Sequence, residues 1–308
     1  MTRASQCAWC GAALDERAQR LRGRCRCARC GVATTDPWPD DAELERAYAG
    51  WYRPSSGRFS GPGDRLLQRM RGQLSRRLDA AAPPGRVLDV GAGDGSLLDA
   101  LRQRGRDALG LERESHRPDV RAVEIDELHE RFAAIVFWHS LEHLRAPGGA
   151  LACAAELLEP GGLLVLALPN AGSLQARRFG HAWLALDLPR HLVHIPAPAL
   201  LARLRELGLA VERVSYWRGG QVVFGWLHGL VGLLPGHPNL YDAVRRAEAR
   251  SGRMGGGRRL ATLLAGTLLL PLAAALTVVE VALRRGGTVY VEARRPAAAT
   301  VAAARERG

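Results

Sequence analysis

Residues 87–95 read Val-Leu-Asp-Val-Gly-Ala-Gly-Asp-Gly, and they are the most informative segment of the chain. Its first four residues are largely apolar and predict a buried strand. Three glycines follow at alternate positions, Gly91, Gly93 and Gly95, and a helical segment begins at Ser96. Glycines allow a tight turn and let the backbone approach a ligand closely. A strand, a glycine turn and a helix start in this order predict a nucleotide-type binding crevice.

The glycine spacing indicates the class of ligand. A dinucleotide fingerprint needs G-x-G-x-x-G, but Ser96 stands where the third glycine would be. The motif instead resembles the first motif of class I S-adenosylmethionine-dependent methyltransferases. Leu109–Glu112 then reads as a second strand that ends in a carboxylate, which can accept hydrogen bonds from two ribose hydroxyls. The resemblance implies a cofactor site built from Asp89, Gly91, Ala92, Gly93, Gly95 and Glu112.

The resemblance continues along the chain. Ala133–Trp138 reads as the fourth strand, and His139-Ser-Leu-Glu-His143 is similar to the segment that follows it in the family. His139 is therefore also expected beside the cofactor. Pro160-Gly-Gly162 resembles the turn into the fifth strand, and residues 179–192 resemble a bacterial subgroup with an N-terminal zinc ribbon and small-molecule substrates. The family implies an α/β fold with a Rossmann-like, doubly wound, seven-stranded sheet.

Two positions depart from the family pattern. Ala133 stands where the family usually has an aspartate. Only about ten residues separate Glu112 from Val123, which leaves little room for the usual helix. The adenine side of the site is therefore expected to be unusual. Asp126 and its neighbour Glu127 are the available partners for an adenine amino group, although exposed acids in a loop are more often simply solvated.

Five of the six cysteines lie within residues 7–30. Two C-x-x-C-G knuckles, about 17 residues apart, are typical of a tetrahedral zinc site. A segment this small needs such a staple to fold. We expect a structural zinc, because four thiolates leave no open coordination position. Cys25 could replace Cys27 as a ligand only if the C-x-x-C spacing were lost, so it is left out. The expected ligands are Cys7, Cys10, Cys27 and Cys30.

The 308-residue chain carries 43 Lys+Arg against 31 Asp+Glu, a net charge of +12. Every one of the 43 is arginine, which indicates biased codon usage and weakens the case for nucleic acid as a partner. The charge favours an anionic membrane surface or a phosphorylated substrate. Met1–Gln6 is polar and shows no signal-peptide pattern, so we expect a cytoplasmic protein.

Alternating strand and helix patterns predict a parallel sheet covered by helices. Strands are expected near 86–90, 107–111, 121–125, 133–138, 163–168, 211–216 and 287–294, and helices near 64–82, 96–104, 147–158 and 197–207. The predicted organisation is a zinc ribbon (1–35), a linker (36–63), a cofactor-binding core (64–218), an apolar helical insertion (219–285), the last strand (286–295) and a disordered tail (296–308).

The insertion contains twenty uncharged residues, Leu260–Val279, enough to reach about 30 Å as a helix. Arginine pairs at 258–259 and 284–285 bracket this run. A single membrane crossing would separate the last strand from its sheet, so a hairpin, an in-plane element or a buried lid remain. Pro271 favours a broken or re-entrant element over a straight helix.

Methyl transfer needs a base only if the nucleophile must lose a proton. His143 and His191 are the preferred candidates, because one follows the fourth strand and the other lies in a segment expected to cover the pocket; either could instead be a structural histidine. Arg190 could bind an acidic substrate group or pair with Asp187.

The sequence therefore predicts a methyltransferase for a small-molecule, lipid-linked or sugar-linked acceptor. The enzyme could be cytoplasmic or peripheral to the inner face of the membrane. A nicotinamide-dependent oxidoreductase and a non-catalytic zinc-ribbon binding protein are the alternatives. No nucleic-acid partner is expected, and the residues do not say whether oxygen, nitrogen or carbon receives the methyl group.

Overall fold

The computed structural model describes residues 2–49, 62–217, 220–245 and 254–297, with the backbone alone at 62–68, 70 and 71. Most of the predicted tail and part of the predicted linker lie outside these residues.

The central sheet has seven strands in the order β10-β11-β8-β7-β4-β5-β6. Strands β4 to β8 pair in parallel, whereas β11 runs antiparallel to both β8 and β10. This mixed sheet confirms the predicted fold class. The strands are β4 Val87–Val90, β5 Ala108–Leu111, β6 Val120–Arg121, β7 Phe132–Trp138, β8 Leu158–Pro169, β10 Ala210–Ser215 and β11 Thr288–Arg294.

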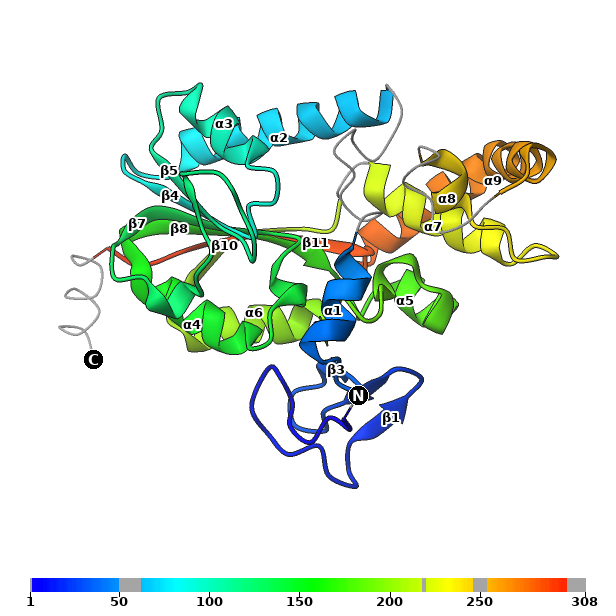
Figure 1. Cartoon of the computed structure of the whole chain (residues 1–308), viewed down its shortest axis with the longest axis horizontal. Helices are drawn as coiled ribbons and strands as arrows, with labels where there is room; N and C mark the ends of the chain where they lie inside the picture. The colour runs from blue at the N-terminus through cyan, green and yellow to red at the C-terminus, as the bar shows by residue number, and fades with distance from the viewer. Residues whose placement is uncertain (1, 50–61, 218–219, 246–253, 298–308) are drawn as a thin grey trace.

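Helices cover both faces of the sheet (Figure 1). On one face lie α2 (Pro62–Ala81) and α3 (Ser96–Arg102), and on the other lie α4 (Pro147–Leu157) and α6 (Ala197–Glu206). Alternate residues of the central strands supply two separate apolar clusters, one under each helical layer. The carboxyl ends of β4, β5 and β7 lie together on one side of the sheet, and we call this side the functional edge.

The third predicted strand is shorter than expected and lies earlier in the chain. The strand β6 has two residues, and residues 125–127 form a 3-10 turn in which only Ile125 is buried. The acidic side chains of Glu124, Asp126 and Glu127 cannot be buried in a sheet without partners, so the chain turns away from the edge. No helix lies between Glu112 and β6, as predicted from the short spacing.

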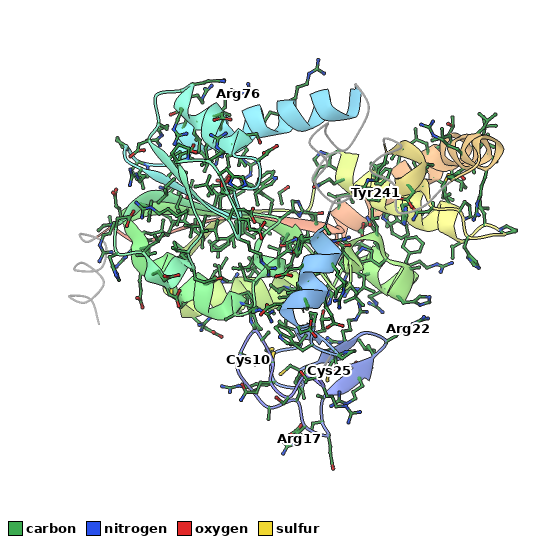
Figure 2. The ribbon with its side chains drawn as sticks, viewed as in Figure 1. Cys10, Arg17, Arg22, Cys25, Arg76 and Tyr241 are labelled. Carbon is green, nitrogen blue, oxygen red and sulfur yellow. The ribbon has the colours of Figure 1, made fainter. Side chains whose placement is uncertain are left out.

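The N-terminal residues 2–35, which we call the cysteine module, form a second small sheet. Its strands are β1 (Gln19–Leu21), β2 (Arg24–Arg26) and β3 (Ala33–Thr35), and its fourth strand, β9 (Val193–His194), comes from the core. Figure 2 labels two of its cysteines, Cys10 and Cys25. The module and the α4 side of the core share one apolar cluster.

Between the module and the core lies α1 (Asp41–Tyr48). Asp40 accepts a hydrogen bond from the Glu43 backbone, and the Glu43 side chain accepts one from the Asp40 backbone. This capping box fixes where the helix begins. Helix α1 thereby carries Tyr48 up to the functional edge of the sheet.

Between β10 and β11 the chain leaves the sheet as three helices, which we call the arm (described residues 220–245 and 254–285). They are α7 (Gly220–Gly232), α8 (Leu240–Val244) and α9 (Gly256–Ala282), and they project to one side of the molecule (Figure 1). The expectation that Pro271 would break the last helix is wrong, because α9 runs through it. Leucine and alanine on both sides of the proline have high helix propensity, and α9 packs on both α7 and α8.

Candidate active site

The glycine turn after β4 forms the floor of the site. The backbone N–H groups of Gly91 and Ala92 both donate to the carbonyl oxygen of Leu111, which ties the turn to β5. One residue beyond Leu111, the Glu112 carboxylate accepts a hydrogen bond of 2.8 Å from the Gly93 N–H. The two motifs selected from the sequence, the glycine turn and the acid after the second strand, therefore meet.

The glycines of the turn differ in what surrounds them. All three have positive φ values, which favour glycine. A Cβ on Gly91 would lie 2.4 Å from Cβ of Ser140, so this glycine is needed for packing of the turn on the segment after β7. A Cβ on Gly93 would meet nothing within 4 Å. The space over Gly93 is therefore open for a ligand to approach the backbone.

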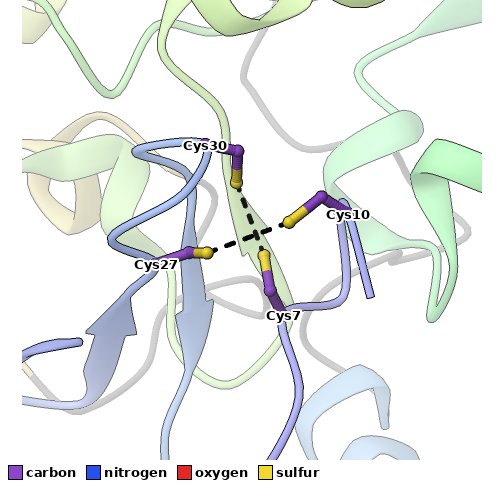
Figure 3. Close-up of side chains that lie close together, drawn as sticks. All are labelled: Cys7, Cys10, Cys27 and Cys30. Atoms are coloured by element: carbon purple, nitrogen blue, oxygen red, sulfur yellow. Dashed lines mark hydrogen bonds between the residues drawn. The ribbon is translucent and has the colours of Figure 1, made fainter. Parts of the chain in front are cut away.

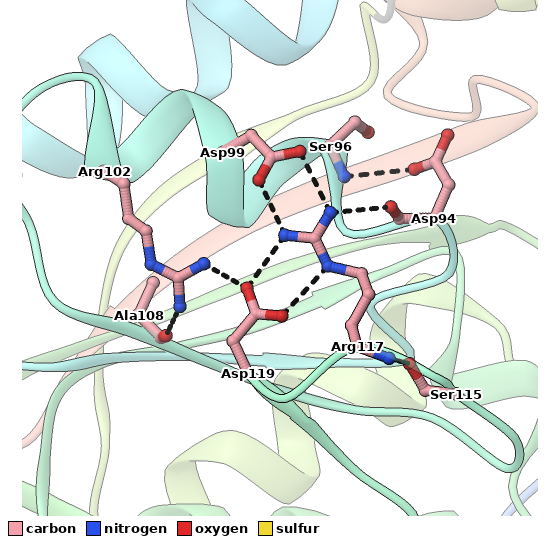
Figure 4. A network of polar contacts seen from close by, with 8 residues as sticks. All are labelled: Asp94, Ser96, Asp99, Arg102, Ala108, Ser115, Arg117 and Asp119. Atoms are coloured by element: carbon pink, nitrogen blue, oxygen red, sulfur yellow. Dashed lines mark hydrogen bonds and ion pairs between the residues drawn. The ribbon is translucent and has the colours of Figure 1, made fainter.

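An ionic network replaces the missing helix between β5 and β6 (Figure 4). Arg117 pairs with Asp99 of α3 and with Asp119, and Arg102 also reaches Asp119. The two arginines hold the pKa of the Asp119 carboxyl well below its usual range. The Arg117 guanidinium packs against Gly95. The network thus fastens the loop 112–119 to the glycine turn without a helix.

A second group of polar side chains follows β7. Glu142 and His143 lie in a 3-10 turn, and His191 reaches them from the segment between α5 (Leu174–Phe179) and β9. A nitrogen of each imidazole and a carboxylate oxygen of Glu142 all lie within 4.8 Å of one another. The two rings meet edge to face, with their centroids 4.6 Å apart. These three groups could share a proton or hold a divalent cation.

Burial controls the charges of this group. Burial lowers the pKa of His143 to about 4, so the imidazole is neutral at pH 7. Its Nδ1 lies 2.9 Å from the carbonyl oxygen of Arg190, and since a carbonyl only accepts, Nδ1 carries the proton and Nε2 keeps a lone pair. Burial opposes ionisation of Glu142, which is 2% exposed, but the nearby imidazoles of His139, His143 and His191 lower its pKa to about 2.

The cysteine module holds the segment that carries His191. Strand β3 pairs with β9, and the Thr35 N–H donates to the Leu192 carbonyl. The Thr35 hydroxyl donates to the His191 carbonyl at 2.7 Å and lies 3.2 Å from Nε2 of His194. On the other side, the Leu192 N–H donates to the Glu142 carbonyl. His191 is therefore fixed between the module and the turn after β7.

Comparison with known proteins identifies the family. The family described as a methyltransferase domain matches residues 64–214. A ubiquinone biosynthesis O-methyltransferase from Xanthomonas oryzae pv. oryzae is 30% identical over 166 residues, which cover 46% of this chain and 69% of the relative. The chain belongs to the class I S-adenosylmethionine-dependent methyltransferases. This membership displaces the nicotinamide-dependent and non-catalytic alternatives.

Further similar proteins carry the same type of name. A ubiquinone biosynthesis O-methyltransferase from Cereibacter sphaeroides is 28% identical over 187 residues, covering 52% of this chain and 75% of the relative. Among solved structures, an S-adenosylmethionine-dependent methyltransferase from Archaeoglobus fulgidus has 16% identity and a TM-score of 0.42, over 74% of this chain and 98% of that chain.

The residues of this methyltransferase fit the cofactor of its family. The open space over Gly93 gives a bulky ligand access to the backbone, and the Glu112 carboxylate beside it offers acceptors for ribose hydroxyls. His139 follows β7 with φ 54°, a left-handed conformation that is uncommon for a residue with a Cβ and often marks functional sites. Its Nδ1 lies 3.5 Å from Glu142, so it joins the cofactor edge to the buried group.

The four predicted cysteines lie together (Figure 3). Sγ of Cys7 is 3.6 Å from Sγ of Cys30, and Sγ of Cys10 is 3.8 Å from Sγ of Cys27. Sulfurs at the corners of a zinc tetrahedron, with bonds of about 2.3 Å, lie about 3.8 Å apart. The donor set therefore fits zinc. The proximity of Cys30 lowers the pKa of Cys7 to about 5, which favours the thiolate that a metal needs.

Both knuckles have the same backbone construction. The Gly11 N–H donates to the Cys7 carbonyl, and the Gly31 N–H donates to the Cys27 carbonyl. Both glycines have φ near +70°, which explains why glycine follows each C-x-x-C. Cys25 is fully buried and lies outside the cluster of four thiols, in agreement with its exclusion.

The remaining predicted residues have other neighbours. Asp126 lines a shallow hollow with Cys153 and Glu156 of α4, and its role at the adenine stays a prediction. Arg190 pairs with Asp187 and donates to the Ala47 carbonyl, so of the two sequence interpretations the structure favours the ion pair.

Sequence reasoning missed the role of Tyr48. Its hydroxyl lies 2.9 Å from Nδ1 of His143, and its ring packs under Arg113, next to Glu112. Tyr48 thus touches both the base candidate and the chain beside the ribose acid. Only its place in an aromatic-rich stretch before the core hinted at this position, because its contacts cross 95 residues of sequence.

Proposed function

We propose that this methyltransferase places a methyl group on a hydroxyl oxygen of a small acceptor, either free or linked to a lipid or sugar. The observation that carries the proposal is the buried group of Glu142, His143 and His191 at the cofactor edge. A neutral hydroxyl is a weak nucleophile and must lose a proton during methyl transfer. A neutral imidazole beside a buried carboxylate is suited to accept that proton.

The cofactor supplies an electrophilic methyl group on a sulfonium. The chain must therefore orient the reactants rather than activate the donor. Gly93 would allow the cofactor to approach the backbone, and Glu112 would hold its ribose. Asp89, a buried residue of β4 two positions before Gly91, would support the turn. His139, whose Nδ1 lies 3.5 Å from Glu142, would lie beside the cofactor.

In this proposal His143 is the base. Its protonated Nδ1 is held by the Arg190 carbonyl, so the Nε2 lone pair is the one that can accept the acceptor's proton. Once His143 is charged, Glu142 stabilises the imidazolium, as a buried carboxylate does for a neighbouring histidine. His191, whose Nδ1 lies 2.9 Å from the Ala185 carbonyl, is the second candidate.

The names of the similar proteins support the choice of reaction. The similar curated proteins are named O-methyltransferases of ubiquinone biosynthesis, and oxygen is the atom that most needs a base. We further propose that the four cysteines hold a structural zinc, since four thiolates would leave it no open position for chemistry. The metal would then act on the active site only through β3 and β9.

Calorimetry with S-adenosylhomocysteine tests the cofactor site. The purified chain should bind this product and give no heat with NAD. Glu112→Ala removes the acceptor for two hydroxyl donors and should weaken binding by about 1–3 kcal/mol. Gly93→Val should abolish binding, since its side chain would occupy the open space. Binding of NAD alone would contradict the assignment.

The base is tested separately, with isotopically labelled cofactor and a panel of phenols, catechols and sugar alcohols. His143→Gln should lower kcat by about 100-fold to 10,000-fold and leave cofactor binding unchanged. His194→Gln is the matched control, because His194 is buried close by but contacts Thr35. If a chelator that spares the cysteine site abolishes turnover, the buried group holds a cation and the base assignment is wrong.

A further inference from the structure

The arm has an inverted distribution of side chains. Its longest helix, α9, packs along α7 and α8 with its small and polar residues. The buried positions of α9 are Thr262, Gly266, Ala273, Thr277 and Glu280. A Cβ on Gly266 would lie 3.2 Å from Leu240 of α8, so glycine allows the helices to approach closely. Close contact through small residues is typical of helix packing within lipid.

The one acidic residue of this inner face is fully engaged. Glu280 accepts hydrogen bonds from the Gln175 backbone, the Gln175 side chain and the Trp226 indole, at 2.8–3.0 Å. These bonds fasten α9 to α7 and to α5 of the core. The orientation of α9 is thereby fixed, and its opposite face must point away from the protein.

That outer face is apolar and exposed. Leu264, Leu268 and Val278 are 56%, 82% and 63% exposed, and Leu260, Leu272 and Val279 are exposed beside them. The outer face carries no charged side chain between Arg259 and Glu280. A lid of a soluble protein would bury these leucines and expose its threonines and glutamate. The buried-lid alternative from the sequence therefore does not describe α9.

Charge around the arm indicates what covers this face. The two acidic side chains of the described arm, Asp242 and Glu280, are both buried. Arg258 at one end of α9, and Arg284 and Arg285 at the other, are exposed. Arg177 and Arg178 of the adjacent α5 are exposed as well. Exposed cations at both ends of an apolar surface complement a bilayer with anionic headgroups.

The lengths of the arm's helices indicate whether the arm crosses a membrane or lies in its plane. In the described chain, α9 is the one helix long and apolar enough to cross a membrane. Its partner α7 has 13 residues, or about 20 Å, which is too short to return across a core of about 30 Å. A helix lying in the plane keeps both arginine ends at the headgroups and lets the chain return to β11 on the same side.

We propose that the arm docks this methyltransferase on an anionic lipid bilayer, with the outer face of α9 lying in the plane of the membrane among the upper acyl chains. The first turn of α7 also reaches the active site, since Gln221 lies 3.4 Å from Nε2 of His139. The arm is therefore in direct contact with the cofactor edge. The docking itself does not depend on which acceptor is methylated.

Flotation of the full-length, zinc-loaded protein tests the proposal. The vesicles contain phosphatidylcholine alone or mixed with phosphatidylglycerol. The wild type should float with the anionic vesicles, and Leu264→Ser/Leu268→Ser should lower partitioning on the order of 100-fold, because two exposed leucines no longer enter the acyl layer. Leu21→Ser/Val214→Ser is the matched control, since it removes two exposed apolar side chains outside the arm and should float as the wild type does.

A second variant tests the charges. Arg258→Ser/Arg284→Ser/Arg285→Ser should weaken binding to anionic vesicles by about fivefold per arginine and leave binding to neutral vesicles unchanged. Zinc content and the thermal midpoint verify that each variant is folded.

The proposal fails if the wild type stays with the unbound fraction, or if the leucine variant floats equally well. It also fails if the wild type forms a vesicle-free dimer that the leucine variant abolishes while neither floats. That result would assign the outer face to a second copy of the chain.

Discussion

The cysteine module and the arm both extend from the central sheet. The module packs its apolar surface against the core, whereas the arm leaves apolar side chains exposed on its outside. The module shares an apolar cluster with α4 and α6, and Trp9 packs so closely on Gly148 that a Cβ there would lie 2.1 Å from the Trp9 carbonyl oxygen. The arm shares a small apolar cluster, around Phe179 and Trp226, with α5 and the segment after it, and leaves leucines exposed.

The contrast separates two ways in which an added segment can serve an active site. The module satisfies its surface within the chain, so its effect must be internal: it holds β9 and with it His191. The arm leaves a large apolar face unsatisfied, so its effect requires something outside the chain. Loss of the module should therefore reduce methyl transfer, whereas changes on the outer face of the arm should alter membrane binding alone.

The largest effect is expected from Cys10→Ser. Loss of one thiolate should release the metal, because a structural zinc site binds through its complete donor set. Without the module β9 loses its partner strand, and turnover should fall on the order of 100-fold. Metal analysis by mass spectrometry and a turnover assay measure the two effects. The partly buried Cys153, which is not one of the four clustered thiols, provides the control variant Cys153→Ser, which should keep zinc and activity.

The contrast between the module and the arm would be contradicted if Cys10→Ser lost zinc but kept full turnover. The module would then be as independent of the active site as the arm's outer face.

A smaller effect is expected from Thr35→Val, which acts where the module meets the active site. The isosteric change leaves the His191 carbonyl without its donor and should cost about 1–3 kcal/mol in the free energy of unfolding. Thr34→Val is the control, because Thr34 is equally buried but its hydroxyl accepts from the Ala8 N–H within the module. Urea titration should show that both variants lose stability, and only Thr35→Val should lower kcat.

Equal losses of kcat in the two threonine variants would show that module stability, and not the bond to His191, is what the active site requires.

The pH dependence of stability should differ between the core and the arm. Burial lowers the pKa of His143 to about 4 and that of His194 well below its ordinary value. The unfolded chain then binds more protons than the native chain between about pH 4 and 6.5, so stability rises with pH across that window. His143→Gln should reduce the rise in the free energy of unfolding by about 1.4 kcal/mol per unit of pKa shift, as measured by urea titration.

The arm contains a comparable group, His228, whose pKa burial lowers to about 4. His228→Gln should leave the midpoint of the core unchanged and alter only hydrogen exchange in α7 and α8 at low pH. A midpoint shift as large as that of His143→Gln would show that the arm and the core unfold together.

Much of the core could be predicted because its signals are local. The glycine turn, the acid at Glu112 and the paired cysteines each depend on residues a few positions apart, and the structure brings each set together. The contacts that complete the active site are not local. Tyr48 meets His143 across 95 residues, and Thr35 meets His191 across 156, so neither contact leaves a periodic pattern.

For the arm, the apolar composition could be predicted from the sequence, but the buried face of its helices could not. Its apolar runs were evident in the sequence, but composition cannot say which face of a helix is buried. The answer depended on Glu280 finding three donors on α5 and α7, which fixes the rotation of α9. The outcome at Pro271 also depends on tertiary structure, because α9 packs on α7 and α8 and stays continuous through the proline.

The smallest effect is expected from Glu280→Gln, which tests whether the arm supports the active site. The amide keeps one oxygen acceptor, but its NH₂ must face either the Gln175 backbone N–H or the Trp226 indole, both of which are donors. One buried donor is then left unsatisfied, at about 1 kcal/mol or slightly more. Hydrogen exchange should therefore quicken in α7 and α9, and the emission of Trp226 should shift, while zinc content and turnover of a water-soluble acceptor stay unchanged. If turnover fell in proportion to the loosening of α9, the arm would be holding the active site from within, as the cysteine module does, and the contrast between the two regions would be lost.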